Sequence, residues 1–309
     1  MKILLLHQYF NTLDDSGSIR AYEFCKRLVK NGHEVTVITS LPNEHSNSFK
    51  WYFKKVDDIK IYYLPNKYNN NFGFYSRIFS FLRFAILSIF KTLKVEYDLI
   101  IATSTPLTIA IPALISSKIK KKKFIFEVRD LWPEMPIAVG AIKNKLMIQV
   151  LKKFENIIYN NASKIICLSP GMKKGVIKSN IQPKKTVIIP NSCDFKLFNE
   201  KSKNYSECEK KYSYLFESKT ILYAGALAKL NGVNYLIEIA KYFKNQKNIK
   251  FVIVGDGSEK KKIKDNAIKS YLLNKNVFIF DKLKKKEIVY FFNKCTISSS
   301  LFMLSRVVS

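Results

Sequence analysis

The residues best suited to catalysis lie in one short run, from Glu127 to Glu134, which follows an apolar strand pattern and continues into a loop. Carboxylates placed there can orient hydroxyl groups or exchange protons, and a guanidinium can stabilise developing negative charge. We therefore predict Arg129, Asp130 and Glu134 as catalytic residues. The alternative is a loop held by ion pairs, in which Trp132 serves as packing.

The turn before the first predicted helix, Asp15 to Arg20, is a candidate anion site. Small residues at a helix N-terminus leave backbone N–H groups unpaired, and the helix dipole favours negative charge there. Arg20 would add a forked donor beside the N–H groups around Gly17. A plain turn with a helix cap is the alternative.

Glycines recur in the second half of the chain where predicted strands end and helices begin. Gly225 lies in the stretch Tyr223 to Lys229, and Gly255 and Gly257 lie in the stretch Val254 to Glu259. Because glycine has no Cβ, backbone at these positions can approach a phosphate or a base closely. Together with the polar stretch Ile189 to Asp194, these segments indicate ligand-binding loops.

These candidate residues require a frame of strands and helices. Short apolar runs alternate with amphipathic helical patterns, which favours a parallel sheet with helices on both faces. In such folds the ligand binds beyond the carboxyl ends of the strands. The strands predicted in the first part are Lys2 to Tyr9, Glu34 to Thr39, Lys60 to Leu64, Asp98 to Ala102, Phe124 to Val128, Lys164 to Leu168 and Thr186 to Ile189.

A polar stretch near position 200 divides the chain. Between Phe195 and Ser218 the pattern lapses into Lys, Glu, Asn, Ser and Tyr, which predicts a linker with one short helix at most. The predicted fold class is α/β, with two Rossmann-like doubly wound domains at residues 1–198 and 219–309 and a linker at 199–218. Three strands are few for such a domain, so we expect the second to be incomplete. They are Thr220 to Ala224, Ile249 to Val254 and Val277 to Phe280.

The chain of 309 residues is strongly basic, with 53 Lys and Arg against 24 Asp and Glu, a formal net charge of +29. Six of the 53 basic residues are arginines, the side chain suited to reading bases and phosphates, so nucleic-acid binding is not indicated. Two interpretations of the charge remain open: a compositional drift toward lysine, or attraction to an anionic membrane surface.

Five cysteines and three histidines are scattered along the chain, without Cys-x-x-Cys pairs or metal-ligand spacing. Neither a disulfide framework nor a metal site is predicted. The apolar run after Met1 ends at His7 and is too short for a signal peptide. We expect a cytoplasmic protein, peripheral on the inner face of the cell membrane if its charge binds lipid.

The segment Phe72 to Lys94 predicts one long helix. At 100° per residue, its Ser, Arg and Lys side chains fall within an arc of about 140°, while most of its aromatic and aliphatic side chains fill the rest. This pattern is typical of a helix at a lipid interface, and it is too often interrupted for a spanning segment. The alternative is a helix packed on the sheet with a solvated basic edge.

Several stretches resemble glycosyltransferase family 4, which has the GT-B fold, and most of all its fucosaminyltransferase-like branch of O-antigen and capsule synthesis. They are His7 to Phe10, Gly32 to Thr39, Glu127 to Glu134, Leu168 to Met172, Ile189 to Asp194, Tyr223 to Gly225 and Gly255 to Gly257. The resemblance implies transfer of a sugar, with retained configuration, from a UDP- or GDP-type nucleotide-sugar donor. It implies a lipid-linked saccharide or polysaccharide acceptor on the first domain, the donor mainly on the second, and no metal or other cofactor.

The same resemblance implies roles for the candidate residues. Asp130 and Glu134 would face the reacting sugar or acceptor, and Arg129 stands where the family commonly has a histidine. The family's diphosphate clamp of Arg and Lys corresponds to Ala226 and Asn231, which leaves Lys229 as the candidate substitute. Residues implied to bind donor or acceptor are Gly17, Arg20, Asn191, Gly225, Lys229, Gly255 and Gly257.

The end of the chain departs from the family pattern. The family continues into a loop with two glutamates that binds the donor sugar and ribose, whereas Ser298 to Ser309 contains no acidic residue. We expect a truncated C-terminus, produced by a frameshift or premature stop, and the loss of most donor affinity. An inactive remnant or a partner-binding fragment is the alternative to an active transferase.

Overall fold

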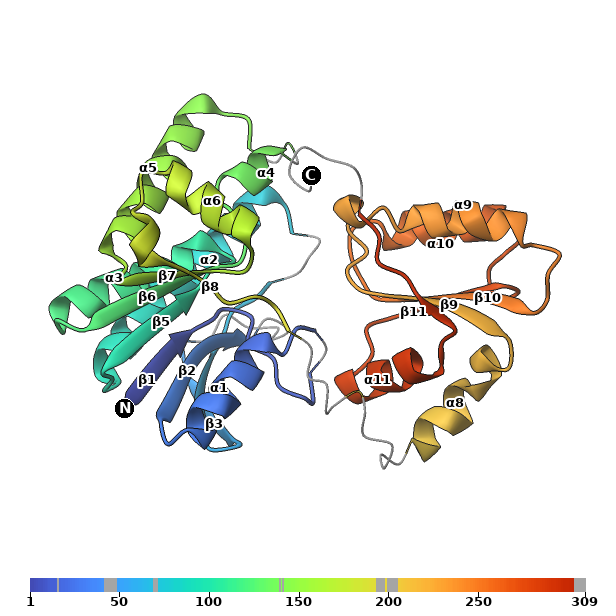
Figure 1. Cartoon of the computed structure of the whole chain (residues 1–309), viewed down its shortest axis with the longest axis horizontal. Coiled ribbons are helices and arrows are strands. Elements are labelled where there is room, and N and C mark those ends of the chain that lie inside the picture. The colour runs from blue at the N-terminus through green and yellow to red at the C-terminus, as the bar shows by residue number, and fades with distance from the viewer. Residues whose placement is uncertain are drawn as a thin grey trace. The chain divides into compact units, whose positions relative to one another are not determined.

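The computed structural model describes residues 1–15, 17–41, 49–68, 72–138, 140, 142–192, 198 and 205–302 (Figure 1). By their contacts the residues form two compact units: unit 1 comprises 1–10 and 18–192, and unit 2 comprises 11–17 and 193–309. Residues 199–204 of the predicted linker lie outside the described residues. So do residues 303–309, which make up most of the stretch on which the expected truncation rests.

Unit 1 contains one eight-stranded sheet with the order β3-β4-β2-β1-β5-β6-β7-β8. All neighbouring pairs are parallel except β3 with β4. The strands are β1 (Lys2–Leu6), β2 (Glu34–Leu41), β3 (Tyr52–Val56), β4 (Ile59–Pro65), β5 (Leu99–Thr103), β6 (Lys123–Val128), β7 (Lys164–Cys167) and β8 (Thr186–Ile188). All seven predicted strands are present, and β3 is an exposed edge strand that the sequence analysis did not predict.

Helices cover both faces of this sheet. Phe84 of α2 and Ile158 of α5 lie in one buried cluster with Leu4 and Leu6 of β1. Leu5, the residue between them, points to the opposite face, where it lines a small cavity with α1 side chains. The helices are α1 (Arg20–Lys30), α2 (Phe74–Lys94), α3 (Ala110–Ile119), α4 (Glu134–Ala138), α5 (Lys145–Asn161) and α6 (Pro170–Lys178).

Unit 2 contains a parallel four-stranded sheet with the order β11-β10-β9-β12. The strands are β9 (Lys219–Ala224), β10 (Ile249–Val254), β11 (Val277–Phe280) and β12 (Ile297–Ser298), and the helices are α8 (Ser206–Phe216), α9 (Asn234–Tyr242), α10 (Lys260–Lys269) and α11 (Lys285–Lys294). Figure 1 shows α9 and α10 on one face and α8 and α11 on the other, and each pair packs on its own buried cluster. The expectation of three strands is wrong, because β12 returns to pair with β9.

The orientation of α2 corrects the sequence analysis. Ser80, Phe84, Ser88 and Thr92 are buried on its inner side, so part of the predicted polar arc faces the sheet. The alternative of a helix packed on the sheet is confirmed for this side of α2, although the two serines do not belong to a solvated edge. Periodicity located the helix, but the inner side is filled by small hydroxyl side chains around Phe84, and larger apolar side chains point to solvent.

Candidate functional site

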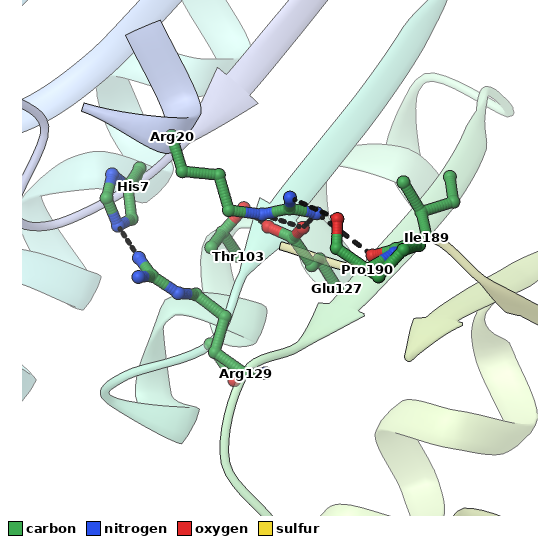
Figure 2. A network of polar contacts seen from close by, with 8 residues as sticks. His7, Arg20, Thr103, Glu127, Arg129, Ile189 and Pro190 are labelled. Atoms are coloured by element: carbon green, nitrogen blue, oxygen red, sulfur yellow. Dashed lines mark hydrogen bonds and ion pairs between the residues drawn. The ribbon is translucent and has the colours of Figure 1, made fainter. Parts of the chain in front are cut away.

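The carboxyl edge of the sheet of unit 1 brings together charged and polar side chains from α1, β5 and β6. Arg20 opens α1, while Thr103 and Glu127 lie at the ends of β5 and β6, which are neighbours in the sheet. Because parallel strands end at the same edge, residues more than a hundred positions apart meet there. Figure 2 shows Arg20 reaching over Glu127 toward the end of the β8 strand.

Arg20 is engaged by partners within unit 1. Its Nε and Nη2 donate to one carboxylate oxygen of Glu127 at 3.2 and 2.8 Å, and the other oxygen accepts from Thr103 Oγ1 at 2.9 Å. Its Nη1 and Nη2 also donate to the carbonyls of Pro190 and Ile189, at 3.0 and 3.2 Å. The ion pair is largely buried, with 19% and 12% of the two side chains exposed. Four of the five N–H groups of Arg20 are therefore used in holding the edge together.

The side chain of Arg129 contacts His7, which follows β1 and was not among the predicted site residues. Arg129 Nη1 lies 3.1 Å from His7 Nε2, and since arginine can only donate, Nε2 accepts and the ring proton lies on Nδ1 (Figure 2). Burial, and to a smaller extent the charge of Arg129, lowers the pKa of His7 to about 3. His7 is therefore neutral near pH 7, and no described residue accepts a hydrogen bond from its Nδ1.

Asp130 and Glu134 follow β6 in the loop and at the start of α4. Asp130 Oδ2 accepts a hydrogen bond from Thr105 Oγ1 at 2.8 Å, and the backbone N–H of Arg129 donates to Ser104 Oγ at 2.8 Å. These contacts tie the β6 loop to the loop after β5. Glu134 is exposed and has no hydrogen bond or ion pair with any described residue. Its carboxylate is thus open to solvent, in contrast to that of Glu127.

Two further predicted site residues, Asn191 and Gly17, lie in the polar turns. Asn191 is exposed just after β8. Gly17 has a φ of +126°, and a Cβ there would lie 2.9 Å from Asn11 Nδ2, so the turn fits glycine. The turn before it is held by Asp15, whose Oδ2 accepts from the backbone and hydroxyl of Thr12. The residue between them, Ser16, lies outside the described residues.

In unit 2 the predicted glycines meet at the ends of the adjacent strands β9 and β10. A Cβ on Gly255 would lie 1.9 Å from the carbonyl oxygen of Gly225, and a Cβ on Gly257 would lie 2.5 Å from that of Leu227. The two loops are joined by the Leu227 N–H, which donates to the Asp256 carbonyl at 2.9 Å. Only glycine allows these backbones to pack so closely.

Lys229 follows these loops at the start of a short 3-10 turn, Lys229–Asn231. Its side chain is exposed and makes no hydrogen bond or ion pair within the described part of the chain. The predicted residues Gly225, Lys229, Gly255 and Gly257 therefore lie at or just beyond the same edge of the unit 2 sheet. Such an edge offers backbone N–H groups and one unengaged ammonium group to an anion.

Glu155 is an ionisable group that the site prediction missed. It lies on α5, is 3% exposed, and accepts a hydrogen bond from Tyr159 Oη at 2.7 Å. Burial raises its pKa to about 7, with a further contribution from the charge of Glu134. No sequence signal marks it, because its neighbours on α5 show an ordinary amphipathic pattern.

Over the described ranges, no group of three or more His, Cys, Asp and Glu side chains is arranged to hold a metal ion. In the same part of the chain no helix combines the length and the apolar character needed to cross a bilayer.

Comparisons with known proteins agree with this architecture. A family model for glycosyltransferase family 4 matches residues 17–197, and one for glycosyl transferases group 1 matches residues 178–305. No curated protein sequence matches the chain.

Solved structures match almost the whole chain. Anabaena HepE in complex with UDP and glucose has a TM-score of 0.65 and 16% identity, over 98% of this chain and 74% of that one. A glycosyltransferase from Rickettsia africae has a TM-score of 0.63 and 18% identity, over 97% of this chain and 72% of that one. Sucrose-phosphate synthase from Thermosynechococcus elongatus has a TM-score of 0.69 and 13% identity, over 98% of this chain and 77% of that one. These likenesses confirm the predicted α/β fold class with its Rossmann-like GT-B architecture.

Proposed function

The chain belongs to glycosyltransferase family 4, and from this membership we propose that it transfers a sugar from a nucleotide-diphosphate donor to an acceptor hydroxyl. The observation that carries the proposal is the pair of glycine loops after β9 and β10, on the part matched by the group 1 model. The Anabaena structure named above holds UDP, which is the kind of ligand such loops suit.

The donor is proposed to bind unit 2. A departing diphosphate needs positive charge and N–H donors that are fixed before the reaction begins. The backbone around Gly225, Gly255 and Gly257 is held rigidly by its own close packing, and Lys229 adds an ammonium group without a competing partner among the described residues. UDP- and GDP-sugars are the proposed donor classes.

The acceptor is proposed to bind the carboxyl edge of unit 1, with Asp130 and Glu134 near the reacting groups. Asp130 is oriented by Thr105 and Glu134 is exposed, so both are suited to hydrogen bonding with sugar hydroxyls. Arg129, oriented by His7, is proposed to stabilise negative charge. Arg20 acts as a positioning residue for this edge, and Gly17 and Asn191 are proposed to contact substrate from the polar turns.

The finer features of the reaction are proposed from the family resemblance. They are retention of the anomeric configuration, transfer without a metal ion, and a lipid-linked or polysaccharide acceptor used in making surface glycans of the O-antigen or capsule type. An acceptor anchored in lipid would place the reaction at a cytoplasmic membrane face.

The proposal is tested by release of nucleotide from a panel of UDP- and GDP-sugars, with and without a lipid-linked saccharide. We expect one donor to be turned over, and Asp130→Asn to lower kcat by about a hundredfold while leaving the calorimetric donor Kd unchanged. Glu34→Gln, at the opposite edge of the same sheet in an exposed ion pair with Lys60, is the matched control and should keep full activity.

The two outcomes that oppose the proposal are distinct. Donor binding without turnover would favour an inactive or partner-binding protein of this family. No binding of any sugar nucleotide would remove the assignment of the glycine loops.

A further inference from the structure

We propose that α2 docks unit 1 onto an anionic lipid bilayer, with its outward apolar side chains inserted at the interface. The proposal concerns a surface whose binding to vesicles needs no sugar nucleotide, so it can be judged separately from the transfer reaction. The surface is called the α2 stripe and consists of Tyr75, Phe79, Leu82, Ile86 and Phe90.

The α2 stripe is continuous. Its residues are spaced by four, three, four and four positions, which places them within an arc of about 80° on one side of a helix and over a length of about 22 Å. Each is between 40% and 84% exposed. Five large apolar side chains in one row are more than the scattered exposure usual on a soluble surface, and such rows mark interaction sites.

The opposite side of α2 is the side that packs on unit 1. Phe84 fills the core there, and around it Ser80, Ser88 and Thr92 are buried. The side-chain amide of Asn66 donates hydrogen bonds to the hydroxyl and carbonyl oxygens of Ser80, and the hydroxyl of Thr92 donates to the Ser88 carbonyl. On this side Phe84 and the partly buried Leu87 pack against the core, whereas the side chains of the α2 stripe point away from it.

Charge selects the kind of partner. The sequence of α2 contains Arg77, Arg83, Lys91 and Lys94 and no acidic residue. Arg83 lies beside the stripe on the helix and over the exposed ring of Phe49 at 5.3 Å, while Lys91 lies further round the helix, over Tyr62 at 3.6 Å. Aromatic rings with lysine and arginine beside them are characteristic of surfaces that lie in the headgroup region.

A pocket of about 420 Å³ adjoins the first turns of the stripe. Tyr75 and Phe79 of the stripe line it, together with Lys67, Arg83 and the buried Asn66. The basic lining fits the phosphate of an anionic lipid whose acyl chains lie along the stripe. A net charge of +29 over the chain adds long-range attraction to such a bilayer, whereas a neutral protein surface would gain nothing from it.

The test is sedimentation with vesicles of phosphatidylcholine alone and of phosphatidylcholine mixed with phosphatidylglycerol, without any nucleotide. We expect binding to the mixed vesicles that weakens as salt is raised. The double substitution Phe79→Ser and Ile86→Ser should weaken it by about tenfold or more, since two interfacial anchors are lost. Because both side chains are exposed, the far-UV spectrum and melting temperature should not change.

The matched control is the double substitution Val150→Ser and Ile157→Ser on α5, which removes two exposed apolar side chains, also seven positions apart, from another helix of unit 1. It should bind vesicles as the unchanged protein does. Equal binding to neutral vesicles, or unchanged binding after the α2 substitutions, would overturn the proposal. So would a concentration-dependent dimer, seen by light scattering without lipid, that the α2 substitutions abolish, because a second copy would then cover the stripe.

Discussion

The two sheets offer different chemistry at the same kind of edge. In unit 1 the carboxyl ends of β1, β5 and β6 carry ionised or polar side chains that hold one another, such as Arg20 with Glu127 and Arg129 with His7. In unit 2 the ends of β9 and β10 carry glycines, and their backbones touch. Unit 1 should therefore be sensitive to changes of charge, and unit 2 to the addition of a single methyl group.

The largest effect is expected for Gly255→Ala. The new Cβ would lie 1.9 Å from the Gly225 carbonyl oxygen, so the two loops must separate, at a cost of about 3 kcal/mol or more in the free energy of unfolding. The measurement is denaturant unfolding together with donor binding. Gly32→Ala in unit 1 is the control, because its φ is +80° with nothing within 4 Å of a Cβ, and it should cost about 1 kcal/mol. Similar costs at both positions would break the comparison.

The next effect is expected for Arg20→Met, which leaves the carboxylate of Glu127 buried without its ion pair. A loss of about 3 kcal/mol in unfolding free energy follows from breaking one side of such a pair. Adding Glu127→Gln removes the stranded charge and should recover part of the loss. If the double variant is as unstable as Arg20→Met alone, charge is not what makes this edge sensitive.

A pH-dependent effect is expected for Glu155→Gln. The pKa of Glu155 is about 7 in the folded protein against a usual 4.5, so the folded state binds the proton more tightly and loses stability as pH rises between these values. Glutamine keeps an acceptor for Tyr159 and carries no charge. The variant should be more stable than the parent by up to about 3 kcal/mol above pH 7, with no difference from this source below pH 4. Unfolding curves at pH 4, 6 and 8 would measure it, and a constant difference would contradict it.

The smallest effect is expected for Lys229→Met, which should weaken donor binding about tenfold, or about 1.4 kcal/mol, without changing stability. Lys247→Met is the control, since Lys247 is an exposed lysine just before β10, at the other end of the same sheet. Calorimetry with the preferred donor provides the measurement. An equal loss in both variants would show that only overall charge matters.

The positions of most strands along the chain and the glycine loops could be predicted because their signals are local. Apolar runs located ten strands, and Gly225 and Gly255 follow two of them. β3 was missed because its residues are mostly exposed at the sheet edge and show no alternation, and β12 was missed because it has only two residues. A local pattern cannot show pairing with a distant strand.

The contacts within the candidate site were beyond prediction for a related reason. Arg20 and Glu127 are 107 positions apart, and His7 and Arg129 are 122 apart. Spacing along the chain carries no information on such pairs until the strand order is known. The prediction of which side of α2 faces the sheet was wrong for a different reason. Periodicity defines two sides of a helix, but it does not show which of them packs on the core.

The contacts of Arg20 with the carbonyls of Ile189 and Pro190 have a mechanical consequence. Unit 1 ends at Ser192, so these carbonyls belong to the last residues of the chain before it passes into unit 2. A single guanidinium thus anchors the departing chain to the first helix and to the middle of the sheet. Replacing Arg20 would therefore remove the ion pair with Glu127 and, at the same time, release the backbone at Ile189 and Pro190 from the end of β6.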